Sequence, residues 1–283
     1  MLFKEHQYEF FASYIFEHTG IHYQESNYFQ LDSRIKNLLK FLECDCVDKL
    51  ITEFKTKKDK ASHQMLIDLA TNNETYFFRD PVMFSGLRKS VYPIIKEKLE
   101  SGGDYRVWSA ACSSGQEINS VIMSFLEEDP AILGKKIQFD ATDISSEILD
   151  KARSGIYTQL EVQRGLPIMM LSKYFEPETE RTWRAKANLK QANVNFSEFN
   201  LLTGHFPVKK YDLIFCRNVL IYQKKENKSQ ILEKLSQALR PGGLLIMGNT
   251  ENTHGLTESF ENAQFPGVSF YQVVDKDLIK KVA

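Results

Sequence analysis

A turn of small residues and a carboxylate further along the chain have the types and spacing to hold a nucleoside. Residues 107–117 read Val-Trp-Ser-Ala-Ala-Cys-Ser-Ser-Gly-Gln-Glu, which predicts a buried strand, a tight turn over residues 112–115 and the start of a helix. Small residues at such a turn let the backbone approach a ligand closely. Because the turn lacks the glycine spacing of dinucleotide sites and the Lys-Ser/Thr pair of a phosphate-binding loop, we expect a ligand without a pyrophosphate.

Asp143 is the carboxylate best placed to bind the ribose of such a ligand. It ends an expected strand, and an acid at the tip of the second strand of a doubly wound sheet can accept hydrogen bonds from both ribose hydroxyls. The alternative is that Asp143 or Ser145 only caps the following helix. Asp140 points to the opposite side by strand alternation. We favour ribose binding by Asp143, because the small-residue turn lies one unit upstream.

The segment over residues 71–80 is too aromatic for an ordinary linker. It reads Thr-Asn-Asn-Glu-Thr-Tyr-Phe-Phe-Arg-Asp and so places three aromatic residues beside Arg79. One interpretation is a staple between domains, with Arg79 paired to Asp80 or to another acidic residue on the surface. The other interpretation is a clamp on a cofactor or a substrate.

A third cluster of polar residues follows a buried apolar strand. Arg217, Asn218 and Tyr222 crowd the carboxyl end of that strand, which is where ligands bind in a parallel sheet. Asn200 and Leu201 follow the preceding strand and would reach the same edge. The alternative is that these are ordinary loop residues.

Strands and helices that alternate along the chain must position these groups. Residues 1–72 show only helical periodicity and predict a small helical module, and a connecting helix is expected over residues 83–99. The expected strands cover residues 105–111, 136–142, 194–199, 212–216, 244–248 and 268–274. The expected helices cover residues 117–127, 145–153 and 227–239. This alternation predicts βαβ units and a mainly parallel sheet, and the long stretch 155–192 predicts small elements of its own.

Composition and charge exclude several classes of protein. The formal net charge of −1 argues against binding to nucleic acid or another polyanion. No apolar run reaches membrane-spanning length and the N-terminus has no apolar signal core, so we expect a cytoplasmic protein without membrane insertion. The four cysteines form no C-x-x-C pair, so we expect reduced thiols and no metal site.

Taken together, these motifs resemble the CheR-type chemotaxis receptor methyltransferases, which use S-adenosylmethionine. The matching pieces, in the family's order and spacing, are residues 73–79, 108–117, 141–145, 215–222 and 239–243. The resemblance implies an α/β protein with a small N-terminal helical domain and a Rossmann-like class I S-adenosylmethionine methyltransferase domain. The implied divisions are a receptor-docking helical domain over 1–72, a linker and helix over 73–100, the methyltransferase domain over 101–283 and an inserted small β subdomain over 155–192.

The resemblance also assigns roles to individual residues. Those expected around the cofactor are Asn73, Thr75, Arg79, Glu117, Asp143, Asn200, Leu201, Arg217 and Asn218. Arg79 and Tyr222 are expected to act as the catalytic pair, facing the methyl group and the acceptor carboxylate. The implied reaction gives glutamyl methyl esters and S-adenosylhomocysteine. A glutamate is ionised at neutral pH, with a reference pKa of about 4.3, so this reaction needs no general base.

Two rival functions stay open. A related enzyme could methylate another acceptor, but an amine would need a base or a carbonyl cage, which Arg79 does not provide. A non-catalytic scaffold that binds cofactor or receptor is the rival from another class, and the presence of Arg79, Asp143 and Tyr222 argues against it.

The implied partner is the cytoplasmic helical domain of methyl-accepting receptors. The helix face that carries Arg34, Lys36 and Lys40 is a candidate dock, with a solvated helix face as the alternative. In some family members the inserted subdomain captures a receptor's C-terminal pentapeptide by adding a strand to its edge. Residues 178–186 lack the glycines often found there, so we expect no pentapeptide binding in this chain. We expect a monomer.

Overall fold

The computed structural model describes residues 2–56, 59–265, 268 and 270–274. Its N-terminal part is a helical module with a core of its own. The helices are α1 (Glu5–Thr19), a short 3-10 turn η1 (Glu25–Gln30), α2 (Leu31–Phe41), α3 (Val47–Thr56) and α4 (Lys60–Ala70). Helix α1 ends at Gly20, which has a φ of 73° that favours glycine. Phe11 and Ile15 of α1 pack with Ile35 and Leu38 of α2 in the module's buried core, as the helical periodicity predicts.

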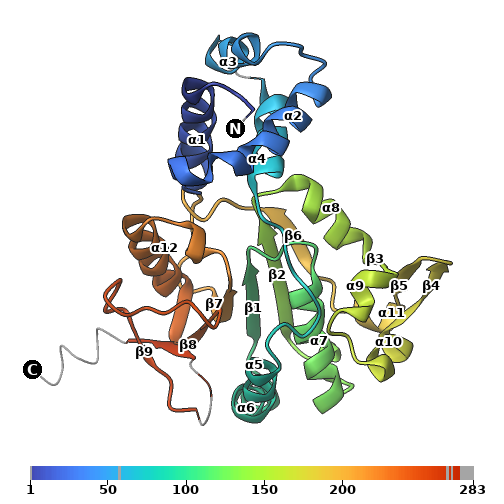
Figure 1. The fold of residues 1–283 in the computed structure, drawn as a ribbon. Helices are drawn as coiled ribbons and strands as arrows, with labels where there is room; N and C mark the ends of the chain where they lie inside the picture. Colours follow the sequence, from blue (N-terminus) through green and yellow to red (C-terminus); the bar gives the residue numbers. More distant parts are fainter. Residues whose placement is uncertain (1, 57–58, 266–267, 269, 275–283) are drawn as a thin grey trace, which may run out of the picture.

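A seven-stranded sheet forms the centre of the second part (Figure 1). Its strands are β1 (Tyr105–Ala110), β2 (Ile137–Asp143), β6 (Asn195–Glu198), β7 (Tyr211–Cys216), β8 (Leu239–Met247), β9 (Phe260–Asn262) and β10 (Tyr271–Val273). The order is β6-β2-β1-β7-β8-β10-β9; the first five strands are parallel, β10 pairs antiparallel with β8, and β9 pairs antiparallel with β10. The predicted α/β fold with a mainly parallel sheet is confirmed.

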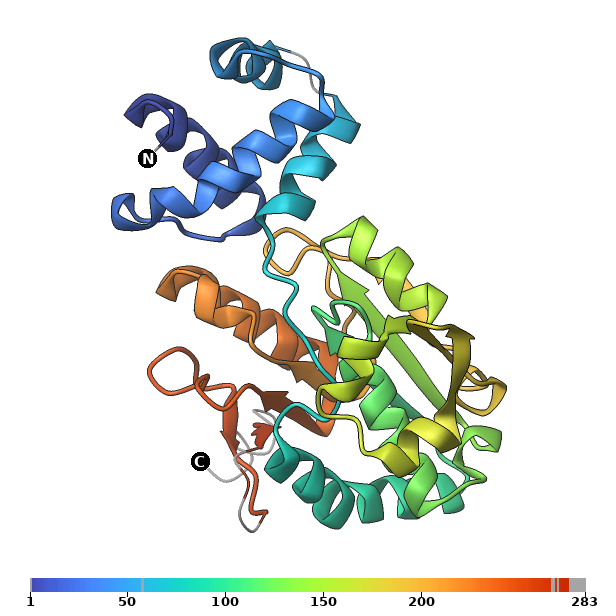
Figure 2. The same cartoon turned by 45° about the vertical axis from the view of Figure 1, so that its right-hand side comes forward.

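Helices cover both faces of this sheet, because neighbouring strand residues point to opposite sides. Val107 and Leu213 belong to one apolar core, with α6 (Tyr92–Glu100) and α7 (Gln116–Glu128). Trp108 and Ile214, the next residue in each strand, belong to the other core, with α12 (Lys225–Ala238). Figures 1 and 2 show α12 separated from α7 by the sheet.

Residues 155–192 contain a separate three-stranded antiparallel sheet. Its strands β3 (Ile156–Thr158), β5 (Thr182–Ala185) and β4 (Phe175–Thr179) lie in that order. Helix α8 (Ser146–Ser154) comes directly before this stretch. The stretch also contains three short helices: α9 (Gln159–Gln163), α10 (Ile168–Tyr174) and α11 (Ala187–Lys190). The prediction that this stretch has small elements of its own is confirmed. We call residues 155–192 the inserted subdomain.

The expected helix over residues 83–99 is interrupted. The structure has α5 (Pro81–Gly86), a π-helical turn η2 (Leu87–Val91) and then α6. The wide turn ends just before Pro93, which has no N–H to continue an α-helical ladder. Strand β9 was not predicted, because three residues are too few to show an alternating pattern.

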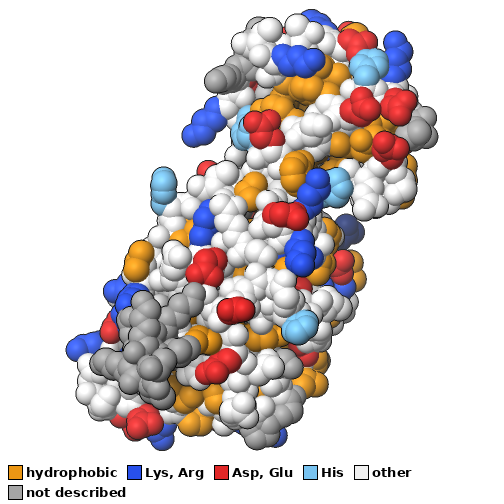
Figure 3. Space-filling model, turned by 90° about the vertical axis from the view of Figure 1, so that its left-hand side faces the viewer, with side chains coloured by type: hydrophobic (Ala, Val, Ile, Leu, Met, Phe, Trp, Pro, Cys, Tyr) orange, Lys and Arg blue, Asp and Glu red, His pale blue; other side chains and the backbone are white. Residues whose placement is uncertain are grey.

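The helical module contacts the sheet domain at the carboxyl ends of the parallel strands. Ile21 forms an antiparallel bridge with Gln223, and Gln64 Nε2 donates to the carbonyl of Ile144 at 3.1 Å. Figure 3 shows the module at one end of an elongated molecule, with acidic and basic side chains interspersed over that face. No helix in the described part of the chain is long and apolar enough to cross a membrane.

Candidate active site

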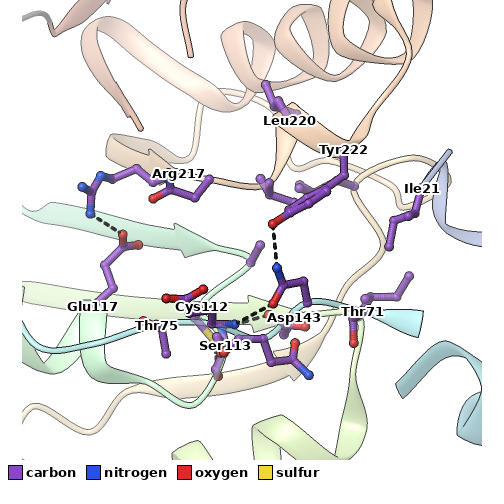
Figure 4. Close-up of a pocket in the computed structure, with 18 of the residues that line it drawn as sticks. Ile21, Thr71, Thr75, Cys112, Ser113, Glu117, Asp143, Arg217, Leu220 and Tyr222 are labelled. Carbon is purple, nitrogen blue, oxygen red and sulfur yellow. Dashed lines mark hydrogen bonds and ion pairs between the residues drawn. The ribbon is translucent and has the colours of Figure 1, made fainter. Parts of the chain in front are cut away.

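A cavity that is open to solvent lies between the helical module and the carboxyl ends of the parallel strands. Every site residue expected from the sequence lines it. These residues are Asn73, Thr75, Arg79, Glu117, Asp143, Asn200, Leu201, Arg217, Asn218 and Tyr222. Figure 4 shows how the paired Glu117 and Arg217 lie away from Tyr222 and Ile21 within this site.

Asp143 is buried at the tip of β2 and braces the small-residue turn. Its carboxylate accepts hydrogen bonds from the backbone N–H of Ser113 at 2.9 Å and of Ser145 at 3.1 Å. Burial raises the pKa of Asp143 above its ordinary value. The cap of helix α8 is instead Ser145, whose Oγ accepts from the N–H of Ile148. The capping alternative therefore applies to Ser145, while the Asp143 carboxylate lies at the cavity wall.

Three residues in and beside the small-residue turn have left-handed backbone conformations. Ala111, Ser113 and Gly115 have φ values of 64°, 50° and 86°. A Cβ on Gly115 would lie 3.2 Å from the Cβ of Ala152 and 3.3 Å from the hydroxyl of Tyr157. These conformations place the Ser113 N–H on Asp143 and its hydroxyl on the carbonyl of Asn73 at 2.8 Å.

Glu117 and Arg217 form a buried ion pair at one end of the cavity. Arg217 Nη1 lies 2.9 Å from Glu117 Oε2, and the arginine side chain is only 2 % exposed. The other carboxylate oxygen of Glu117 accepts from Ser109, and Arg217 Nη2 donates to the carbonyl of Arg79. Arg217 lines the cavity, and its Nε is buried without a hydrogen-bond partner in the described structure. An unpaired donor of this kind is costly, so it fits a site completed by a polar ligand.

Arg79 borders the cavity without a paired acidic side chain in the described part of the chain. Its Nη1 donates to the carbonyl of Glu74 at 3.1 Å, and it makes no ion pair with an acidic side chain in the described part of the chain. Asp80 instead faces Arg217, at 3.7 Å, and caps α5 through the N–H of Met83. The interpretation of Arg79 as one half of an ion pair with Asp80 is therefore wrong.

Tyr222 lines the cavity on the side next to the helical module. The Tyr222 hydroxyl accepts a hydrogen bond from Asn72 Nδ2 at 2.8 Å. Asn200 Nδ2 donates to the carbonyl of His18 at 2.7 Å, while Leu201 is partly buried beside it. The module itself contributes Ile21 to the wall.

Several residues that organise the site were missed by the sequence analysis. Glu251 accepts from the backbone N–H groups of Asn218 at 2.6 Å, Gly248 at 2.9 Å and Ile221 at 3.1 Å, and so fixes the loop that carries Tyr222. A carboxylate in a loop far along the chain gives no local signal of this role. Asn72 could have been predicted, because it belongs to the segment 71–80 that was interpreted as a clamp on a cofactor or a substrate.

Comparison with known proteins decides the family. The family model "CheR methyltransferase, SAM binding domain" matches residues 73–268. The chain belongs to the CheR methyltransferase family. "Chemotaxis protein methyltransferase Cher2" of Pseudomonas putida is 33% identical, covering 93% of this chain and 96% of that protein. "Chemotaxis protein methyltransferase 1" of Vibrio cholerae is 33% identical, covering 94% and 96%. The "Chemotaxis protein methyltransferase" of Salmonella typhimurium is 34% identical, covering 87% and 83%.

Membership of the CheR methyltransferase family makes the chain a methyltransferase that depends on S-adenosylmethionine. The cavity fits this cofactor on its own chemistry. Asp143 offers a buried carboxylate suited to the ribose hydroxyls, and Arg217 Nε offers a buried donor that no protein atom satisfies. The described residues contain no group of three or more His, Cys, Asp or Glu placed to hold a metal ion.

Proposed function

We propose that the chain methylates glutamate side chains of methyl-accepting chemotaxis receptors in the cytoplasm. The observation that carries this proposal is Arg79, a cation at the cavity wall that forms no ion pair with a described acidic side chain. A free guanidinium can hold a carboxylate by two charge-assisted hydrogen bonds. A carboxylate acceptor therefore suits this site better than an amine, which Arg79 would repel when protonated.

The residues proposed to hold the cofactor surround the same cavity. Asp143 takes the ribose, because its carboxylate keeps accepting capacity beyond the two backbone N–H groups that it already binds. Glu117 and Arg217 supply opposite charges at one end. The remaining residues proposed to contact the cofactor are Asn73, Thr75, Arg79, Asn200, Leu201 and Asn218.

The chain's own contribution to the chemistry is positioning. When bound, the cofactor supplies an electrophilic methyl group, and its transfer to a carboxylate oxygen forms a C–O bond while the C–S bond breaks with its electrons left on sulfur. Arg79 holds the acceptor carboxylate, which is already ionised, so no side chain has to remove a proton. The Tyr222 hydroxyl accepts from Asn72, which leaves its own proton free to donate to the acceptor. Both groups thus restrict the acceptor to one orientation.

Receptor docking is proposed for the exposed face of α2. Lys36 and Lys40 are exposed there. Arg34 is turned inward, because its Nε donates to the carbonyl of Leu69 at 2.8 Å and its guanidinium stacks on the Tyr23 ring. Of the three candidate docking residues, Lys36 and Lys40 are therefore the ones free to attract an acidic receptor helix.

Docking can be tested with Lys36→Glu/Lys40→Glu. We expect a weaker apparent affinity for a receptor cytoplasmic fragment and an unchanged affinity for S-adenosylhomocysteine. An unchanged receptor affinity excludes this face.

Calorimetry with a receptor C-terminal pentapeptide tests the separate prediction that the inserted subdomain does not bind such a peptide.

The reaction itself is tested with radiolabelled S-adenosylmethionine and a receptor cytoplasmic fragment. We expect base-labile label on the receptor, as a glutamyl ester gives, and loss of that label with Arg79→Ala. Arg181→Ala, an exposed arginine in the turn between β4 and β5, is the matched control and keeps wild-type labelling. Transfer at the wild-type rate by Arg79→Ala would refute the assigned role. Cofactor binding without any transfer would favour a non-catalytic scaffold.

A further inference from the structure

The inserted subdomain is fastened to the segment that carries Arg79. Phe77 is fully buried, and its ring meets those of Tyr157 and Phe175 edge-on, with centroids 5.0 and 5.4 Å away. These two partners belong to β3 and β4 of the subdomain. Gly165 lies directly against the same segment: at its φ of 87°, an added Cβ would lie 2.0 Å from the carbonyl oxygen of Phe77. The backbone around Phe77 therefore cannot move independently of the subdomain.

Arg164, the residue before that glycine, contacts both residues that support Arg79. Arg164 Nη2 donates to Glu74 Oε1 at 2.6 Å, and its guanidinium lies over the Tyr76 ring, 4.4 Å from the centroid. Arg79 donates to the carbonyl of Glu74, and its guanidinium lies over the same Tyr76 ring at 5.6 Å. Arg164 thus contacts the carboxylate of Glu74 and the ring of Tyr76, while Arg79 contacts the backbone carbonyl of Glu74 and the same ring.

Arg164 also decides where the charge of Glu74 goes. Glu74 is exposed and borders the cavity, and its backbone carbonyl already accepts from Arg79, so its carboxylate is placed to turn toward that guanidinium. In the structure this carboxylate is bound to Arg164, whose hydrogen bond and charge are the main reason that the pKa of Glu74 lies below its ordinary value, while the charge of Arg79 contributes less. While Arg164 binds Glu74, the guanidinium of Arg79 stays available to a substrate.

We propose that Arg164 is a positioning residue for Arg79, acting chiefly by keeping the Glu74 carboxylate away from it and only secondarily by packing on Tyr76, and that the inserted subdomain in this way shapes the acceptor site. The proposal rests on the proposed function, in which Arg79 holds the acceptor carboxylate. It gives the subdomain a part in the methyl transfer itself, separate from any capture of a receptor segment. Arg164 is exposed and lines no part of the cavity, so its effect must pass through these two residues.

The test compares Arg164→Gln with Arg164→Gln/Glu74→Gln, using a receptor cytoplasmic fragment as methyl acceptor. Arg164→Gln frees a charged Glu74 to neutralise Arg79, and we expect kcat to fall about three- to tenfold. The second substitution removes that competing charge, so we expect it to restore kcat to within about twofold of Glu74→Gln alone. The matched control Arg181→Gln, in the same subdomain, keeps the wild-type kcat. S-adenosylhomocysteine affinity and melting temperature are measured for each variant, and we expect both to stay unchanged.

The outcomes separate this inference from the proposed function. A wild-type kcat for Arg164→Gln overturns the inference, and so does a loss that Glu74→Gln does not relieve, because a purely structural defect would persist. If Arg79→Ala transfers methyl groups at the wild-type rate, the proposed function fails instead.

Discussion

Glu117→Gln is the substitution whose effect on stability the structure specifies most closely. Glutamine has the same shape, and rotation of the Ser109 hydroxyl lets it keep both hydrogen bonds, so the change removes only a charge. That charge compensates Arg217, whose side chain is 2 % exposed. Removing one partner of a buried ion pair costs about 3–5 kcal/mol. Because Asp80 Oδ2 lies 3.7 Å from Arg217 and remains, we expect the lower end, about 3 kcal/mol.

Differential scanning calorimetry measures this loss. At about 2 °C per kcal/mol for a chain of this size, the melting temperature should fall by about 5–6 °C. The matched control is Glu147→Gln: like Glu117, Glu147 is the second residue of its helix, but it is exposed. That control should change stability by less than about 0.5 kcal/mol.

A second variant separates loss of charge from loss of packing. In Glu117→Gln/Arg217→Met no buried charge is left uncompensated, so part of the lost stability should return. If the melting temperature of Glu117→Gln lies within about 2 °C of that of Glu147→Gln, the ion pair contributes little to stability and the reasoning is wrong.

Three further predictions address cofactor affinity, acid stability and the subdomain. Asp143→Asn should weaken S-adenosylhomocysteine binding by about 10- to 100-fold in calorimetry, since a hydrogen bond to a charged group is worth about 1.5–3 kcal/mol. Because the ionised carboxylate binds the ribose and its pKa is raised, wild-type affinity should fall with decreasing pH already above the ordinary carboxyl value of 3.8. Arg240 lowers the pKa of Asp104 to about 2. The stability that Asp104 contributes is therefore fully present above pH 3.8 and is lost as the pH falls toward 2. The difference in melting temperature between the wild type and Asp104→Asn should shrink over that range. Gly165→Ala should lower the melting temperature strongly, because its Cβ would overlap the carbonyl of Phe77.

Each of these predictions has a result that contradicts it. Asp143→Asn that keeps the pH dependence of the wild type would assign that dependence to another group. A constant difference between wild type and Asp104→Asn from pH 6 to pH 2 would remove Asp104 from acid unfolding. For Gly165→Ala the control is Gly102→Ala, which has a similar φ of 85° but nothing within 4 Å of the added Cβ. Equal losses at both glycines would show strain in φ alone, without the contact to Phe77.

The elements of the sheet domain could be predicted because their signals are local. Val107 and Trp108 are consecutive residues of one strand, and Asp143 ends the neighbouring strand. The local sequence pattern is enough to predict the end of that strand and the acidic residue there. The π-helical turn before Pro93 could not be placed, because a helical ladder can accommodate a proline in several ways.

The roles of individual polar residues were harder to predict than their presence at the site. Arg34 has the sequence neighbours of an exposed basic residue, yet the Leu69 carbonyl and the Tyr23 ring hold it inward. Arg79 has an acid as its immediate neighbour, yet Asp80 faces Arg217. In both cases the deciding partner comes from a distant segment, and only the folded chain brings the two together.

The helical module and the sheet domain are joined beside the cavity, by the bridge between Ile21 and Gln223. Ligand binding in the cavity and the contact between these two parts of the molecule are therefore linked. Thr19 and Ile21 of the helical module line the cavity together with residues of the sheet domain, so a ligand there spans both parts. A ligand that binds only the joined arrangement stabilises it by about 2.7 kcal/mol at a concentration one hundred times its Kd. By the same linkage, a change that loosens the joint weakens the binding of such a ligand.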